Sequence, residues 1–189
     1  NLEILGATKK GESSILTGEE AINFLVSESK VCFDPACGYA YRLKFWKENG
    51  FEFKKGIYHE DFALIPLIIL KAEKACFTNF DGYFYLQTQN SITRNTSLEK
   101  EKKAIKDHLC GYDFLAEEIE KIKFKSEYAK KLFMSYISNA LIFRLDSIQD
   151  NLKEEYKKEL KKRNVIKHVM SDTFKRKVRK MLLRIKFKL

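Results

Sequence analysis

The stretch that decides the fold spans residues 59–74 and reads HEDFALIPLIILKAEK. Two acids precede an uncharged apolar run, residues 62–70. Acids in a first turn followed by a continuous apolar body predict a buried helix that runs to about residue 74. Pro66 lies inside this helix and is expected to kink it or to mark its first turn. The apolar run is too short to cross a bilayer.

Upstream of this helix, short elements are predicted. Residues 17–20 read TGEE, a capping box in which Thr17 and Glu20 exchange hydrogen bonds, so a helix should follow. A second helix is expected over residues 42–48, ending at Asn49-Gly50. Residues 51–53 alternate and indicate a strand, and residues 76–80 and 83–87 indicate two more, joined by an Asp81-Gly82 hairpin turn.

Downstream, the pattern becomes helical and rich in Lys and Glu. We expect helices at about 98–122, 126–148, 151–163 and 172–187. The predicted fold class is therefore α/β (mixed α+β), with short strands and helices over residues 1–96 and a helical region over 97–189. The 189 residues are 44% hydrophobic, enough for a sizeable core.

Several short motifs follow one another in a fixed order between residues 16 and 93. They are LTGEEA at 16–21, YRLKF at 41–45, NGFEF at 49–53, GIYHED at 56–61, an AEK at 72–74, YFY at 83–85 and SIT at 91–93. This order and spacing resembles the acceptor-side, C-terminal half of bacterial family 2 glycosyltransferases that build capsular and other surface polysaccharides. The resemblance covers roughly residues 14–95.

The resemblance implies part of a GT-A fold and an inverting transfer of a sugar. The donor would be a nucleotide sugar, and the acceptor would be a hydroxyl of a saccharide or of a lipid-linked glycan. It also implies that Asp61 is the general base and that Glu60 has a structural or acceptor-orienting role. Where the family often carries Trp-Asn before its YR pair, this chain has Cys37-Gly38.

The chemistry of a base at this position is sound on its own terms. A sugar hydroxyl is a poor nucleophile, and a carboxylate within hydrogen-bond reach removes its proton as the new bond forms. The N-terminus of a helix favours the ionised carboxylate. The alternative is that Glu60 or Asp61 only caps the helix.

Further residues are candidates for acceptor binding. They are His59, Tyr41, Arg42, Trp46, Gln89 and Ser91. Aromatic faces suit sugar rings, but Trp46 and its neighbours could equally pack into the core. His59 could equally be a polar surface residue, and Gln89 could belong to a hydrogen-bonded loop.

The sequence lacks what a donor site needs. It contains no DxD pair, no glycine-rich phosphate loop and no N-terminal βαβ pattern, so it offers no motif for the Mg²⁺ or Mn²⁺ expected in a full-length enzyme. No metal site is predicted in this chain. We expect it to be a fragment that is inactive alone.

The C-terminal end carries most of the net charge of +10. From Phe174 onward there are eight Lys or Arg and no acid, with apolar residues at helical spacing. A basic amphipathic helix can lie on an anionic membrane through Lys175, Arg176, Arg179, Lys180 and Arg184. The alternatives are a solvated helix whose apolar stripe packs inward, a nucleic-acid contact, or a non-catalytic module that pairs with a nucleotide-binding subunit. Nucleic acid is disfavoured because no recognised motif for it is present. A cytoplasmic location at the inner face of the plasma membrane is expected.

Overall fold

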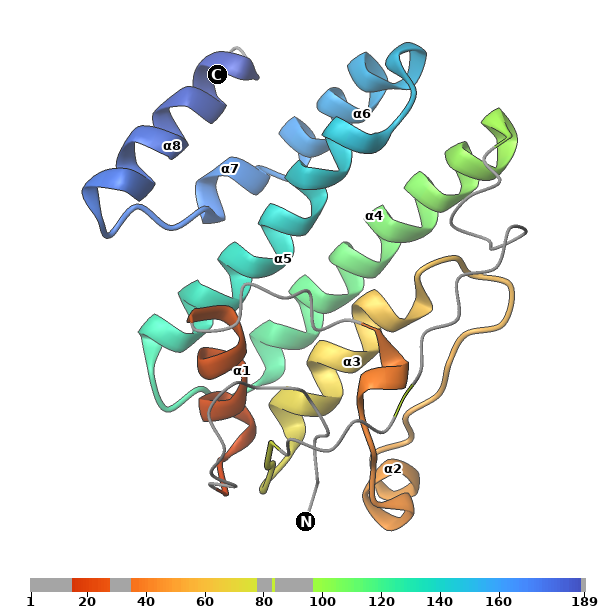
Figure 1. The fold of residues 1–189 in the computed structure, drawn as a ribbon, viewed down its shortest axis with the longest axis vertical. Helices are drawn as coiled ribbons and strands as arrows, with labels where there is room; N and C mark the ends of the chain where they lie inside the picture. The colour runs from red at the N-terminus through yellow and green to blue at the C-terminus, as the bar shows by residue number, and fades with distance from the viewer. Residues whose placement is uncertain (1–14, 28–34, 78–82, 84–96, 188–189) are drawn as a thin grey trace.

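The computed structural model describes residues 15–27, 35–77, 83 and 97–187. Within these residues the chain is helical, and the elements are shown in Figure 1. In chain order they are α1 (Gly18–Ser27), the 3-10 helix η1 (Ala36–Gly38), α2 (Leu43–Glu48), α3 (Glu60–Lys71), α4 (Leu98–Lys121), α5 (Glu127–Ser147), α6 (Asp150–Lys162), α7 (Val165–His168) and α8 (Phe174–Lys186).

The prediction of a mixed α/β fold is wrong for the described part of the chain. No strand occurs there, and the one β-type pairing is an isolated antiparallel bridge between Leu16 and Ala75. Its two backbone hydrogen bonds measure 2.8 and 2.7 Å. The predicted strands at 76–80 and 83–87 lie largely outside the described residues.

Residues 51–53, predicted as a strand, instead follow directly on the C-terminal cap of α2. Gly50, at φ +63°, donates to Lys47 O, and Phe51 donates to Trp46 O, the paired bonds of a Schellman motif. The rings of Phe51 and Trp46 then meet edge to face at 5.8 Å. The apolar residues whose alternation indicated a strand therefore pack against the end of α2.

The capping box is confirmed at the start of α1. Glu20 Oε2 accepts from the Thr17 backbone N–H at 2.7 Å, and Thr17 Oγ1 accepts from the Glu20 N–H at 3.4 Å. Gly18 is required next, because a Cβ there would lie 2.1 Å from the carbonyl oxygen of Ile69. The start of α1 can thus approach the end of α3 closely enough for the Gly18 N–H to donate to Ala72 O at 2.8 Å.

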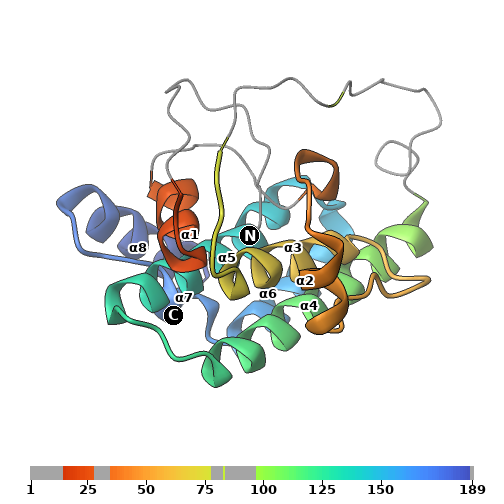
Figure 2. The same ribbon diagram turned by 90° about the horizontal axis from the view of Figure 1, so that it is seen from below.

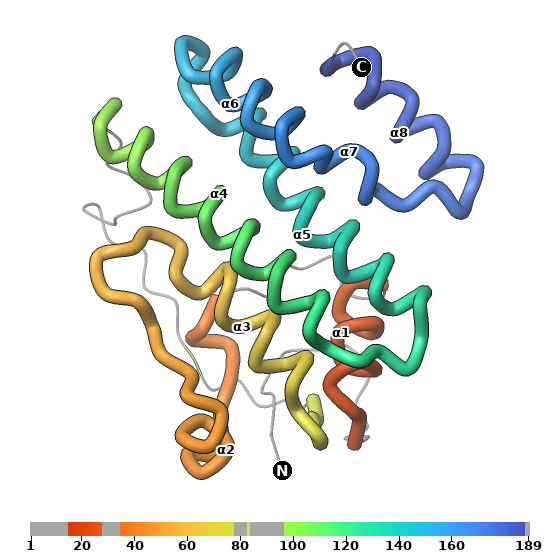
Figure 3. Tube along the Cα trace, turned by 180° about the vertical axis from the view of Figure 1, so that it is seen from behind, coloured from red at the N-terminus to blue at the C-terminus, as the bar shows by residue number. Residues whose placement is uncertain are grey.

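Helix α3 is the centre of the core. It buries every residue from Leu64 to Leu70, and Pro66 stands in its interior rather than in its first turn. Figure 3 shows α3, α4 and α5 lying side by side, and Figure 2 shows α1 and η1 on the opposite side of α3 from α4. One hydrophobic core joins α1 and α3 to α4, α5, α6 and α7.

The helices predicted in the second half are confirmed to within two residues at each end. Polar contacts fix their packing. Arg163, at the end of α6, binds both carboxylate oxygens of Asp113 on α4 at 2.8 Å. Glu19 of α1 accepts from the backbone of Lys125 and Ser126, where α5 begins.

Candidate functional site

The start of α3 sends three polar side chains to two different surroundings. His59 precedes the helix in the left-handed region at φ +57°. Successive helical residues turn by about 100°, so Glu60 and Asp61 point in different directions. His59 and Glu60 both border a pocket, and the His59 ring also meets α4 and α5. Asp61 instead faces η1 and Tyr41.

Asp61 is half-buried between the start of α3 and η1. Burial raises the pKa of its carboxyl, and the neighbouring charge of Glu60 raises it further. The backbone N–H groups of Ala36 and Phe62 hydrogen-bond to the carboxylate and partly offset this rise in pKa. The arrangement gives a fixed carboxylate that is a stronger base than a free aspartate.

Tyr41 lies close enough to Asp61 for their charges to interact. Burial, and then Asp61, raise the pKa of its phenol above the usual range. The Tyr41 hydroxyl is buried and has no hydrogen-bond partner among the described residues. A ligand hydroxyl that reached this position after a local side-chain movement would meet an unused donor near the carboxylate.

Aromatic rings extend this face toward α2. Trp46 lies 5.3 Å from Tyr41 and 5.5 Å from Phe53, measured between ring centroids. Trp46 is half-buried and Phe53 is exposed, so the cluster is part of the surface as well as of the packing. Arg42 is the exposed N-cap residue of α2 and makes no capping hydrogen bond with its side chain.

His59 takes part in a polar cluster that the sequence did not indicate. Its Nε2 lies 3.3 Å from Nη1 of Arg144 on α5, and its ring lies 5.8 Å from that of His108 on α4. Burial and the positive charge of Arg144 lower the pKa of His59, which favours the neutral ring. The neutral ring can accept a hydrogen bond from the Arg144 guanidinium. Burial lowers the pKa of His108 to about 3. Glu101 is also buried here and accepts from the backbone N–H of Gln149 at 3.1 Å.

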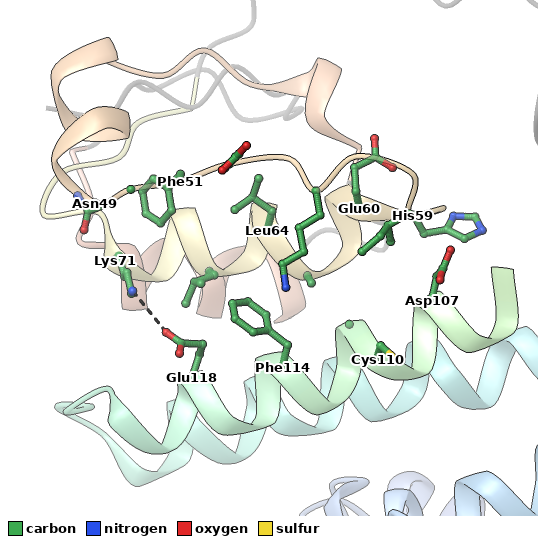
Figure 4. A pocket seen from close by; sticks show the side chains of 17 residues that line it. Asn49, Phe51, His59, Glu60, Leu64, Lys71, Asp107, Cys110, Phe114 and Glu118 are labelled. Carbon is green, nitrogen blue, oxygen red and sulfur yellow. Dashed lines mark ion pairs between the residues drawn. The ribbon is translucent and has the colours of Figure 1, made fainter. Parts of the chain in front are cut away.

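A pocket of about 370 Å³ opens between α3, α4 and the segment that joins α2 to α3 (Figure 4). Leu64 and Phe114 contribute apolar surface, while Glu60 and Asp107 contribute carboxylates. Lys71 reaches across it to Glu118 at 3.6 Å. Asp61 does not line this pocket, so the structure separates the two acids that the sequence placed together.

The segment before α3 is fastened to α4. Asp107 Oδ2 accepts from the backbone N–H of Tyr58 at 2.9 Å and pairs with Lys103. Lys103 also donates to Gly56 O at 2.5 Å, at a turn where Gly56 has φ +75°. These contacts hold the turn that leads into α3 against α4.

The remaining predictions concern two binding residues, a metal site and the membrane. Gln89 and Ser91 lie outside the described residues. Within the described ranges, no group of three or more His, Cys, Asp or Glu side chains is placed to hold a metal ion. None of the described helices combines the length and apolarity needed to cross a membrane.

Comparison of the chain with protein-family models, with curated proteins and with solved structures returns no match. The assignment of a role therefore depends on the geometry of the site and on the sequence motifs.

Sequence reasoning missed the contributions of α4 and α5 to this region. One signal was present: His108 and Gly111 interrupt the Lys- and Glu-rich pattern of residues 98–121. Gly111 marks a close helix contact, since a Cβ there would lie 3.3 Å from the ring of Phe62. Arg144 and Glu101 carried no comparable signal.

Proposed function

We propose that this chain supplies the acceptor-binding side and the general base of an inverting glycosyl transfer. The observation that carries the proposal is the half-buried Asp61 beside the unpartnered Tyr41 hydroxyl and an aromatic surface. The proposal depends on these side chains and on the motif resemblance, and not on the fold class.

In the proposed step, an acceptor hydroxyl lies against Asp61. Its oxygen attacks the anomeric carbon of a nucleotide sugar, its proton passes to the Asp61 carboxylate, and the bond from that carbon to the diphosphate oxygen breaks. The raised pKa of Asp61 makes it a stronger proton acceptor than a free aspartate, while the backbone donors stabilise its ionised form. Attack opposite the leaving group inverts the anomeric configuration.

Trp46 and Tyr41 fit the role of acceptor contacts. A sugar ring can stack on the exposed part of the indole while one hydroxyl reaches Asp61 and another reaches Tyr41 after a local side-chain movement. Glu60 faces the separate pocket, so we assign it no role in proton transfer. Residues outside the described ranges would supply the groups that bind the nucleotide sugar.

The test uses the fact that Trp46 is the only tryptophan in the chain. Binding to an array of surface glycans is measured first, and each hit is then titrated while Trp46 fluorescence is recorded. We expect saturable quenching of this fluorescence. Trp46→Phe should remove the signal. Tyr41→Phe should weaken the affinity by about tenfold, because one buried hydrogen bond is lost. Glu60→Gln is the matched control and should leave the affinity unchanged.

The catalytic part is tested by nucleoside diphosphate release from a panel of nucleotide sugars, with a bound glycan as acceptor. We expect no turnover by this chain alone. In an assembly that supplies the donor site, Asp61→Asn should reduce the rate by about 10²–10⁴-fold while glycan affinity persists. Full activity of Asp61→Asn would assign Asp61 to helix capping.

A further inference from the structure

Helix α8 is attached to the protein along one face. Leu183, and Phe187 just beyond the helix, are buried in the common core. Lys180 donates to the carbonyl oxygens of Lys167 at 2.9 Å and Val169 at 2.7 Å, where α7 ends. These contacts satisfy carbonyls that a helix end leaves free, and they fix the orientation of α8.

The opposite face of α8 presents a stripe of apolar side chains to solvent. Phe174 is 83% exposed and Ile185 is 67% exposed. With the turn of about 100° per residue, the members of this outward stripe share one side of the helix, away from Leu183. The outward stripe consists of Phe174, Val178, Met181, Leu182 and Ile185. A contiguous exposed apolar surface of this kind marks an interaction site.

The cations of α8 fall into two groups. Those on the attached side are already engaged: Arg176 pairs with Asp172 at 2.8 Å, Lys186 pairs with Asp146 at 2.8 Å, and Arg179 lies over the Phe143 ring at 5.2 Å. The others flank the outward stripe, are exposed, and form no ion pair within the described residues. These flanking cations are Lys175, Lys177 and Arg184.

We propose that α8 lies in the surface of an anionic lipid bilayer. The outward stripe enters the boundary between headgroups and acyl chains, and the flanking cations contact headgroup phosphates. This inference does not depend on the proposed glycosyl transfer. Of the five membrane residues suggested by the sequence, the structure leaves Lys175 and Arg184 for lipid and assigns Arg176, Arg179 and Lys180 to contacts within the protein.

Charge and polarity together select this partner. A nucleic acid would satisfy the flanking cations but would leave the outward stripe in water. A second copy of the chain would cover the stripe but would bring its own cations against these, with unfavourable repulsion. Figures 1 and 2 both place α8 at the edge of the molecule, where a flat surface can reach it.

Flotation of the full chain with lipid vesicles tests the proposal. We expect the chain to float with vesicles of phosphatidylglycerol and phosphatidylcholine in equal parts and to remain in solution with phosphatidylcholine alone. Met181→Ser with Ile185→Ser should lower the partition coefficient about 100-fold through lost apolar insertion. Because both side chains are exposed, circular dichroism should show an unchanged fold.

A matched pair of charge variants locates the lipid-facing side. Lys175→Gln with Arg184→Gln should weaken binding about 30-fold, since each cation near the surface contributes about fivefold. Arg176→Gln with Lys186→Gln removes the same net charge from the attached side and should weaken binding by less than about threefold.

Three outcomes would overturn the proposal. Equal losses from the two charge pairs would mean that net charge alone acts. Binding to RNA at physiological salt without vesicle flotation would assign the cations to nucleic acid. A dimer that Ile185→Ser dissociates, again without flotation, would assign the outward stripe to a second copy.

Discussion

Helices α3 and α8 have 12 and 13 residues, and they relate to the protein in opposite ways. Helix α3 buries its apolar body on all sides, so that polar groups reach the surface only at its two ends. Helix α8 buries Leu183 alone among its thirteen residues and leaves a row of large apolar side chains in water. The difference shows that apolar periodicity identifies a helix face without saying what covers it.

The sharpest test of this contrast compares two isoleucines. Ile68 of α3 is fully buried, whereas Ile185 of α8 is largely exposed. Ile68→Ala should lower the free energy of unfolding by about 4 kcal/mol, because it removes apolar contacts and leaves a cavity. Ile185→Ala should change it by less than about 0.5 kcal/mol. Urea denaturation measures both, and a similar cost for the two would mean that the outward stripe is covered in the free protein.

The next test concerns the close contact at the end of α3. Gly18→Ala would place a methyl group against the carbonyl oxygens of Ile69 and Leu70, so we expect a loss of about 3 kcal/mol. Gly38→Ala is the matched control, since no atom lies within 4 Å of a Cβ there. A harmless Gly18→Ala would show that α1 and α3 are further apart than described.

Two adjacent leucines test how α8 is attached. Leu183 is buried against the core and Leu182 is exposed. Leu183→Ala should cost about 2 kcal/mol, near the lower end for a buried leucine because this helix lies at the edge of the protein. It should also speed hydrogen exchange in α8 more than in α3. Leu182→Ala should do neither, and equal effects would mean that the helix is rotated from the orientation described.

The pH dependence of stability near neutral pH should come mainly from His108 of α4, which packs on Phe62 of α3. Burial lowers the pKa of His108 from 6.5 to about 3, so the unfolded chain binds a proton more readily than the folded one. Stability is therefore greatest above the unfolded pKa and is lost as pH falls toward the folded value. His108 should contribute a loss of about 1 kcal/mol between about pH 7 and pH 5.5.

His108→Gln should remove that part of the pH dependence, as judged from urea midpoints across the same range. His168, near α8, also has a pKa lowered by burial but is more exposed. His168→Gln should therefore remove less. If His168→Gln removed more of the pH dependence than His108→Gln, the more deeply buried histidine would be the one beside α8.

Local signals in the sequence predicted several elements correctly. The capping box at Thr17 and the stop at Asn49-Gly50 both formed as expected, because their hydrogen bonds join residues only a few positions apart. The long helices after residue 97 were also predicted, since their apolar spacing is regular. The strand at 51–53 was wrong because Phe51 and Phe53 pack on Trp46 instead of pairing with another strand.

By itself, the sequence determined where most helices begin and end, and it placed an acid pair in the first turn of α3 and a basic apolar pattern in α8. Only the tertiary structure decided what surrounds these groups. It directed Asp61 toward Tyr41 and Glu60 toward a separate pocket, and it brought His108 and Arg144 to His59. It also turned the outward stripe of α8 to solvent. The physical reason is that caps and periodicity depend on neighbours within about one helical turn, whereas burial and pKa depend on residues that are distant in the chain.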